Sequence, residues 1–500
     1  MPLFSKGLGR VCAVAAAGTA AEMCRQVRNA SRSARIIELR LDWLRNDAER
    51  ARLLGWLKHR RLARVTFLAT CRRQEGGGKF AGDIARQLYW LSQAREAGCQ
   101  WCDVEMETFR ELPEGFLRAY PVPSRIMLSI HDFERTPGLP PSIAVARHGQ
   151  VDAVKIATQA KTIADSRRLL KVARRSRSFV AVPMGDVGLP ARLLALREGS
   201  ELAYAPIAEA TAPGQVSLEE TLRLYRPHLL DRKTQVYGVI GDPIGHSLSP
   251  VLHNTGFRAR HINAIYLPFL VHQLGDFLKA IADFGVRGFS VTIPHKQAIL
   301  KHLKECEPLA AEIGAVNTVV VRRDGSLYGC NTDYVGVLRA LQKKLHIQGS
   351  RVLIFGAGGS ARAAAFALAR AGAQVSVSAR RESAATQLAR SAGGEAIPRR
   401  ALRTESFDAI LNATPVGMHP HEGISPLSAR ELQCRIVMDL IYRPERTKLL
   451  EIAAQKGIAT VSGVTMFLAQ GFAQWEIWTG KRAPETVMRR AVLSALRWRS

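Results

Sequence analysis

A lysine, Lys155, lies within an apolar run of the sequence, the segment DAVKIA. A lysine in such a strand loses hydration, which favours the neutral amine, and a neutral amine can attack a ketone. Considered alone, a strand lysine is more often a buried ion-pair partner, here of Glu38 or Glu105. A histidine, His131, ends another apolar run and can move protons near neutral pH. The lysine and the histidine together favour a catalytic site.

Other charged side chains also lie in or directly after apolar runs. The segment IIELRLD alternates so that Glu38, Arg40 and Asp42 share one face of a strand. Three charges on a buried face need partners or a ligand. Further members of this group are Arg72, Glu105, Asp132 and Arg192, and the uncharged Gln215 follows the eighth run.

The elements that position these residues repeat along the first half of the chain. Strand-like runs begin near Val11, Arg35, Arg64, Gln100, Arg125, Asp152, Phe179 and Leu202, each followed by a helical pattern. Eight such units predict a (β/α)₈ barrel over residues 1–230. Active sites of these barrels lie at the carboxyl ends of the strands, where the charged residues are expected to meet.

These residues resemble the type I 3-dehydroquinate dehydratases, which form a Schiff base. The shared motifs are ELRLD, ATCR, DVE, SIHDF, DAVKIA, PMGDVG and APGQ, in this order. The resemblance implies that Lys155 forms the imine, that His131 moves protons and that Glu105 orients His131. It also implies a set of substrate-binding residues: Glu38, Arg40, Arg72, Arg192, Thr211 and Gln215. The chain departs from the usual family residues at Ala191, Ala203 and Thr211.

The segment GAGGSA, residues 356–361, indicates a second functional site. It follows a strand predicted over Arg351–Phe355 and begins a helix. The glycines of such a loop let the backbone approach a pyrophosphate. An acid at the end of the next strand would bind the ribose of NAD, but that strand ends with Arg380 and Arg381. The two arginines are either simply exposed or, as their place favours, bind the extra phosphate of NADP.

The second half also resembles the shikimate dehydrogenases. The motifs are GDPIGHSLSP, VTIPHK, GAVNTVV, GCNTD, LNATPVGM and DLIYRP, followed by Gly463 and Gln470. The resemblance implies that Lys296 and Asp333 are a catalytic pair beside the carbonyl. The implied substrate-binding residues are Ser247, Ser249, Thr292, Asn317, Tyr442 and Gln470. The implied NADP-binding residues are Gly356, Ala357, Gly358, Gly359, Ser360, Ala361, Arg380, Arg381, Thr414 and Gly463.

The chain departs from the dehydrogenase pattern in its cofactor loop. The family often has Asn-Arg-Thr where this chain has Ala379, Arg380 and Arg381, which retains the first arginine. His246, His253 and His295 lack metal-ligand spacing, so we expect no metal site.

The resemblances divide the chain into three predicted domains. These are the barrel (residues 1–230), a substrate-binding domain (236–347, completed by 460–500) and a Rossmann NADP-binding domain (348–459). The product of the dehydratase reaction is the substrate of the dehydrogenase. The sequence therefore predicts a bifunctional enzyme that makes precursors of the aromatic amino acids. One alternative is a quinate dehydrogenase fused to the dehydratase.

Composition limits the other classes of function. The 500 residues are 47% apolar and 23% charged, typical of a globular protein, and no apolar run is long enough to span a membrane. The net charge of +28 is spread along both halves, which favours anionic metabolites over nucleic acid. A nucleic-acid-binding protein on a retired metabolic scaffold remains the alternative from another class. The eight scattered cysteines indicate a reduced, cytoplasmic protein.

Overall fold

In the computed structural model the described residues are 7–60, 62, 64–113, 116, 125–138, 151–175, 178–208, 214–419 and 421–499. Thr211 therefore lies outside the described residues. Contacts divide the chain into two compact units. One comprises residues 1–235 and 268–285, and the other comprises residues 236–267 and 286–500. No helix among the described residues has the length and apolar character needed to cross a membrane.

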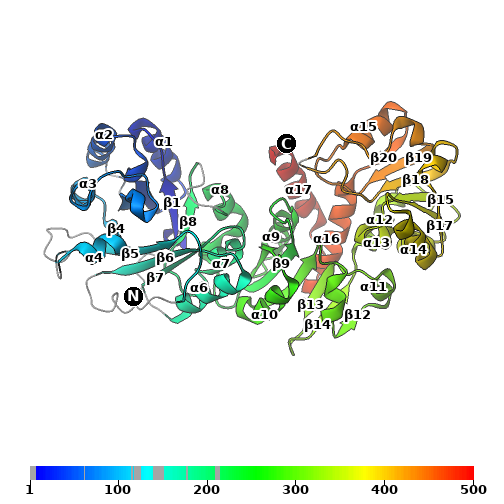
Figure 1. The fold of residues 1–500 in the computed structure, drawn as a ribbon, viewed down its shortest axis with the longest axis horizontal. Coiled ribbons are helices and arrows are strands. Elements are labelled where there is room, and N and C mark those ends of the chain that lie inside the picture. The colour runs from blue at the N-terminus through cyan, green and yellow to red at the C-terminus, as the bar shows by residue number, and fades with distance from the viewer. Residues whose placement is uncertain are drawn as a thin grey trace. The chain divides into compact units, whose positions relative to one another are not determined.

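The first unit is built around eight parallel strands in the order β7-β6-β5-β4-β3-β2-β1-β8. Figure 1 shows β5, β6 and β7 of this sheet side by side. Because β8 pairs with β1, and the Glu201 N–H donates to the Phe179 carbonyl at 2.8 Å, the sheet curls into a barrel. Each strand begins close to its predicted residue, which confirms the barrel. The strands are β1 (Val11–Ala15), β2 (Ile36–Arg40), β3 (Thr66–Thr70), β4 (Trp101–Glu105), β5 (Arg125–Asp132), β6 (Ala153–Gln159), β7 (Phe179–Met184) and β8 (Ala203–Pro206).

Helices with side-chain caps follow several strands of the barrel. Thr19, Asn46 and Asp83 each accept a backbone N–H in the first turn of α1, α2 and α3, which stabilises these helix starts. Inside the barrel, residues such as Leu68, Trp101 and Met127 form an apolar layer. The helices of the first compact unit are α1 (Ala20–Ala30), α2 (Asp47–Lys58), α3 (Ile84–Glu96), α4 (Met106–Glu111), α6 (Ile163–Arg175), α7 (Leu189–Leu194), α8 (Leu218–Glu220) and, from residues 268–285, α10 (Leu274–Phe284).

The second unit contains two sheets, of which the first has the order β10-β9-β11-β13-β14-β12. The strands of this sheet are β9 (Gln235–Gly241), β10 (Ala264–Leu270), β11 (Val286–Val291), β12 (Glu305–Cys306), β13 (Thr318–Val321) and β14 (Leu327–Cys330), and residue 235 of β9 and residues 268–270 of β10 are counted with the first unit. Its helices are α9 (Ser249–Ala259), α11 (Pro308–Ile313) and α12 (Asp333–Leu341). The last two helices, α16 (Gly463–Thr479) and α17 (Glu485–Arg499), both pack on α9, and α16 also packs on α12.

The second sheet of this unit is parallel and has the order β17-β16-β15-β18-β19-β20. The order reverses at β15, and such a switch point is where nucleotides bind in doubly wound folds. Its strands are β15 (Arg351–Phe355), β16 (Gln374–Ser378), β17 (Glu395–Ala396), β18 (Phe407–Asn412), β19 (Cys434–Asp439) and β20 (Ala459–Val461). Its helices are α13 (Gly359–Arg370), α14 (Glu382–Ala392) and α15 (Lys448–Gln455).

Candidate active sites

Lys155 lies in β6 with 4% of its surface exposed. Its Nζ donates a hydrogen bond to Asp103 of β4 and lies 3.8 Å from Glu38 Oε1 of β2. The Tyr204 ring of β8 has its centroid 5.0 Å from the same nitrogen. The ion-pair partners weighed from the sequence were Glu38 and Glu105, whereas the nearest partner is Asp103.

Asp103 is the functional candidate that the sequence reasoning missed. Its carboxylate accepts from Ser129 Oγ at 2.5 Å and lies 3.4 Å from Arg72 Nη2. Burial raises the pKa of Asp103, but the charges of Lys155 and Arg72 outweigh burial and hold this pKa below its usual range. The alternation of WCDVE places Asp103 on the same face as Glu105, and this signal was available in the sequence.

Glu105 is the last residue of β4, and its carboxylate accepts hydrogen bonds from a side chain of α3 and from the backbone of the loop after β3. Gln87 of α3 donates to its Oε2, as does the Arg73 N–H at 3.3 Å, and Thr108 Oγ1 holds Gln87 at 2.7 Å. Burial raises the pKa of Glu105 to about 6. Among the described residues no hydrogen bond joins Glu105 to His131, so the orienting role of Glu105 stays a prediction.

His131 is near the end of β5, where its ring stacks on that of Phe133 with centroids 5.8 Å apart. Burial holds the pKa of His131 well below its usual range, and the positive charges of Arg72, Lys155 and Arg40 act in the same direction. The imidazole is therefore neutral at physiological pH. A neutral ring nitrogen can accept a proton.

The other predicted substrate ligands already have partners in the barrel. Arg40 binds Asp42 through two hydrogen bonds of 2.9 and 2.7 Å, and Thr70 Oγ1 donates to Glu38 at 2.7 Å. Arg192 of α7 donates to the backbone carbonyls of residues 183 and 214, and burial lowers its pKa to about 10. Gln215 is half-buried. These contacts hold the charged groups near the strand ends.

A glycine-rich loop after β3 lies against this cluster. A Cβ on Gly76 would overlap Glu105 Oε1, and a Cβ on Gly77 would overlap the Phe133 ring. Gly77 has φ +76°, a left-handed conformation that glycine adopts without strain. The loop can approach the carboxylate and the aromatic ring this closely because it carries no side chains there.

The predicted catalytic pair of the second unit is in direct contact. Lys296 Nζ donates to Asp333 Oδ2 at 2.5 Å and to Ser360 Oγ at 3.3 Å. Asn317 Nδ2 donates to the other oxygen of Asp333 at 2.7 Å, and Asn331 Oδ1 accepts the Asp333 N–H at 2.9 Å. The carboxylate is therefore fixed at the start of α12 with the lysine beside it.

The predicted substrate ligands lie on several elements, and Asn317 connects one of them, Gln470, to Asp333. Gln470 Oε1 of α16 lies 3.5 Å from Asn317 Nδ2. Ser247 Oγ accepts the Ser249 N–H at 3.2 Å where α9 begins. Thr292 follows β11, and the Tyr442 ring stacks on Phe467 with centroids 4.6 Å apart.

A buried polar chain behind these ligands was not predicted. The Tyr266 hydroxyl and Ser290 Oγ are 2.6 Å apart, Ser290 donates to Gln474 Oε1 at 2.8 Å, and Gln474 Nε2 donates to the Asn317 carbonyl at 3.1 Å. His253, which is also buried, stacks on Tyr266 with centroids 4.4 Å apart. No sequence spacing links these residues, because they come from separate elements that meet only in the fold.

The loop 356–361 fits a dinucleotide. It joins β15 to α13, and no side chain caps the first turn of α13, so its N–H groups can bind phosphate. Gly356 has φ +125°, and a Cβ there would press on the Ala413 carbonyl, whereas a Cβ on Gly358 would meet nothing within 4 Å. The Gly356 N–H donates to Ser378 at the end of β16, just before the exposed Arg380 and Arg381.

Of the two further predicted cofactor residues, Thr414 lies beside Gly356 of this loop. Thr414 Oγ1 donates to Asn412 Oδ1 at 2.7 Å, directly after β18. Gly463 opens α16, and a Cβ there would overlap the Ile441 carbonyl. The glycine is therefore required for close packing at the start of this helix.

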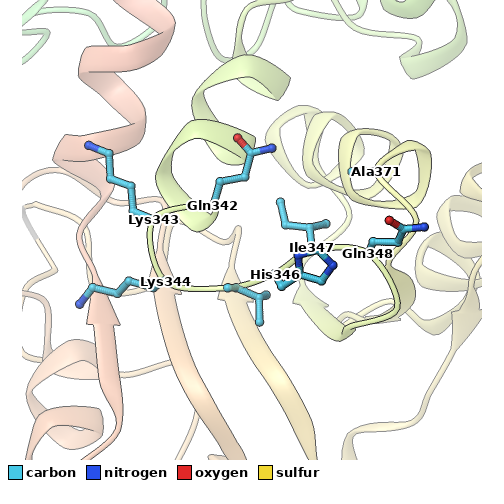
Figure 2. Close-up of a pocket in the computed structure, with 8 residues that line it drawn as sticks. Gln342, Lys343, Lys344, His346, Ile347, Gln348 and Ala371 are labelled. Atoms are coloured by element: carbon cyan, nitrogen blue, oxygen red, sulfur yellow. The ribbon is translucent and has the colours of Figure 1, made fainter.

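A hollow elsewhere on the second unit is lined by residues 342–348 and Ala371 (Figure 2). In Figure 2 the side chains of Lys343 and Lys344 extend to the left, away from Ile347 and Gln348. None of the residues predicted from the sequence lines this hollow. It is therefore separate from the two clusters described above.

Comparisons with known proteins place a boundary between two families after residue 229 and before residue 239. Residues 11–229 match the family model of type I 3-dehydroquinase, residues 239–319 match the shikimate dehydrogenase substrate binding domain, and residues 463–493 match the shikimate 5′-dehydrogenase C-terminal domain. A chloroplastic bifunctional 3-dehydroquinate dehydratase/shikimate dehydrogenase of Arabidopsis thaliana is 34% identical over 475 residues, covering 90% of this chain and 78% of the relative. The chain belongs to this bifunctional family.

Relatives of the dehydrogenase half are also similar. A shikimate dehydrogenase (NADP(+)) of Bacillus mycoides is 45% identical over 259 residues, covering 49% of this chain and 93% of its own. A crystal structure of a shikimate dehydrogenase with NADP+ superposes with a TM-score of 0.50 at 35% identity, covering 53% of this chain and 96% of that one. A shikimate dehydrogenase of Aquifex aeolicus gives a TM-score of 0.50 at 35% identity, covering 53% and 99%. The bifunctional enzyme thus has a lyase half and an oxidoreductase half that uses NADP, and these relatives favour neither alternative function.

Proposed function

We propose that the chain catalyses two successive steps of the shikimate pathway. The barrel dehydrates 3-dehydroquinate to 3-dehydroshikimate, and the second unit reduces this product to shikimate with NADPH. The observation that carries the proposal is the arrangement of the two lysines. Lys155 is buried between carboxylates near a neutral His131, and Lys296 contacts Asp333 beside a dinucleotide loop.

In the barrel, Lys155 attacks the ketone of the substrate and forms an imine, which acts as an electron sink. His131 moves protons during imine formation and elimination, a role that its neutral state supports. Glu105 orients His131. The substrate's carboxylate and hydroxyls are held by Glu38, Arg40, Arg72, Arg192, Thr211 and Gln215.

In the second unit, Lys296 moves a proton to the carbonyl oxygen, and Asp333 positions Lys296. NADPH, when bound, supplies the hydride. Residues 356–361 with Thr414 and Gly463 hold the cofactor, and Arg380 and Arg381 bind its ribose phosphate. The substrate is held by Ser247, Ser249, Thr292, Asn317, Tyr442 and Gln470.

The domain limits and the compartment are part of the same proposal. The barrel covers residues 1–230, the substrate-binding domain 236–347 with 460–500, and the NADP-binding domain 348–459. Packing of α16 and α17 on α9 supports assigning the last helices to the substrate-binding domain. None of the eight cysteines, all within the described residues, forms a disulfide, which supports a reducing compartment such as the cytoplasm. The ligands are small anions, and no nucleic acid is required.

A trapping experiment with the full chain tests this function. Purified protein given 3-dehydroquinate and NADPH is expected to consume NADPH and release shikimate. Borohydride added during turnover should reduce the imine and leave the ligand attached to Lys155, which mass spectrometry detects. Lys155→Ala should lose dehydration and keep the reduction of added 3-dehydroshikimate. Active dehydration with an unlabelled Lys155 would refute the imine mechanism.

A further inference from the structure

Asp103 is the buried carboxylate nearest to Lys155. It has 1% of its surface exposed, and it accepts hydrogen bonds from Lys155 and Ser129. Arg72, the other cation nearby, is 3.4 Å away and also pairs with Glu105 at 3.7 Å. The lysine nitrogen is thus the main positive charge facing Asp103.

The charge on the lysine nitrogen is the same at two stages of imine chemistry. A lysine ammonium carries three protons, and condensation with a ketone forms a C=N bond and breaks the C=O bond. The oxygen leaves as water with two of these protons, and the iminium nitrogen keeps the third. Both species have a charge of +1, so one fixed anion stabilises both without reorganisation.

We propose that Asp103 is the counterion of the iminium that forms on Lys155. The inference rests on the proposed dehydratase function and adds a residue to it. An iminium without a counterion in a buried site loses its proton, because burial disfavours the charged form. The resulting neutral imine accepts electrons poorly, so removal of a substrate proton slows. Asp103 stabilises the positive charge on the Lys155 nitrogen and, through its contact with that nitrogen, fixes its position.

The other titratable groups around this nitrogen leave Asp103 as its main anion. Burial keeps Cys12 and Tyr204 as neutral groups by raising their pKa values, and His131 is neutral because its pKa is depressed. Glu38 is the remaining close anion at 3.8 Å, and it accepts from Thr70. The more distant charged or titratable groups on the neighbouring elements are Arg40, Arg72 and Glu105.

The pH dependence of kcat for dehydration tests this role in the full chain. Asp103→Asn keeps the shape and removes the charge, so the midpoint of the high-pH loss of kcat should fall by about 1–3 pH units. Asp103→Glu retains the charge and should keep the midpoint within about half a unit of the parent. Glu38→Gln, which removes the more distant anion, should shift it less than Asp103→Asn. A midpoint unchanged in Asp103→Asn would overturn the proposal.

A second measurement needs no variant and covers the case in which Asp103→Asn does not fold. Cyanoborohydride reduces the iminium rather than the neutral imine, so labelling of parent Lys155 should be as strong at pH 9 as at pH 7. Labelling that declines with a midpoint near pH 7 would overturn the role of Asp103 while leaving the imine mechanism intact. Absence of labelling at every pH, in protein that dehydrates its substrate, would instead refute the proposed imine itself.

Discussion

The two candidate lysines differ in how far they are withdrawn from solvent. The side chain of Lys155 is 5% exposed and that of Lys296 is 14% exposed. Both were predicted from the sequence, as was Asp333. Asp103 was not, although the register sets Glu105 level with Ser129 and Lys155 across β4, β5 and β6. Lys155 Nζ instead contacts Asp103, which precedes Glu105 by two residues in β4 and lies on the same face of the strand. Such a choice of side-chain direction depends on packing, which residue patterns do not encode.

Lys296 gives the first prediction at this scale. Lys296→Ala should lower kcat for reduction of 3-dehydroshikimate by about 10²–10⁴-fold, because general acid catalysis contributes this much. The Michaelis constant should change less, since the contact with the carbonyl oxygen strengthens as charge develops there. Steady-state kinetics measures both values. Dehydration serves as the internal control and should be spared, and a variant that reduces at the parent rate would make Lys296 structural.

Arg380 gives a prediction about cofactor choice. A charge-assisted contact with the ribose phosphate is worth roughly 1.5–3 kcal/mol, so Arg380→Ala should weaken NADPH binding by about 10- to 100-fold. Binding of NADH, which lacks this phosphate, should barely change. Kinetics with each cofactor on parent and variant separates the two effects. Equal weakening of both cofactors would mean that Arg380 supports the loop rather than binding the phosphate.

Glu105 gives a prediction about stability against pH. Its pKa is raised from 4.5 to about 6 by burial, so between these values the folded barrel binds the proton more tightly than the unfolded chain. The free energy of unfolding should therefore fall as pH rises through this range, by about 2 kcal/mol in total between a pH well below 4.5 and a pH well above 6. Glu105→Gln removes this contribution. Chemical denaturation of parent and variant across this range measures it, and identical pH profiles would contradict the raised pKa.

At the scale of elements, hydrophobic periodicity was sufficient to locate the barrel strands. Alternating and continuous apolar runs mark strands because each buried face needs apolar side chains. The loop after β3 was not predicted to matter, although its three glycines are conspicuous in the sequence. Their role depends on a close approach to Glu105 and Phe133, which belong to other elements. Local patterns carry no information about such long-range contacts.

This loop can be tested by adding a single methyl group. Gly76→Ala places a Cβ against Glu105 Oε1, so the carboxylate must move and kcat for dehydration should fall by about tenfold or more. Gly55→Ala is the matched control, because Gly55 lies in α2 with nothing within 4 Å of an added Cβ. The control should keep parent activity and gain about 1 kcal/mol of stability. Equal activity in both variants would show that the loop tolerates displacement of Glu105.

At the scale of the whole molecule, each compact unit contains one of the two candidate catalytic lysines, the carboxylate that contacts it and the substrate ligands predicted for its reaction. Neither proposed mechanism takes a residue from the other unit. We therefore expect an equimolar mixture of Lys155→Ala and Lys296→Ala chains to convert 3-dehydroquinate to shikimate. Liquid chromatography of the products would measure the conversion, with each variant alone as the control. If the mixture makes no shikimate while each half is active by itself, the two sites do not work independently.

The presence of both sites on one polypeptide also fixes their stoichiometry. Synthesis or degradation of the chain changes the two catalysts together, so a cell cannot relieve a bottleneck between the steps by making more of one enzyme. The pool of 3-dehydroshikimate must instead be set by the kinetic constants of the two halves. Selection on flux would therefore act on the relative speeds of the dehydratase and the dehydrogenase rather than on their relative abundance.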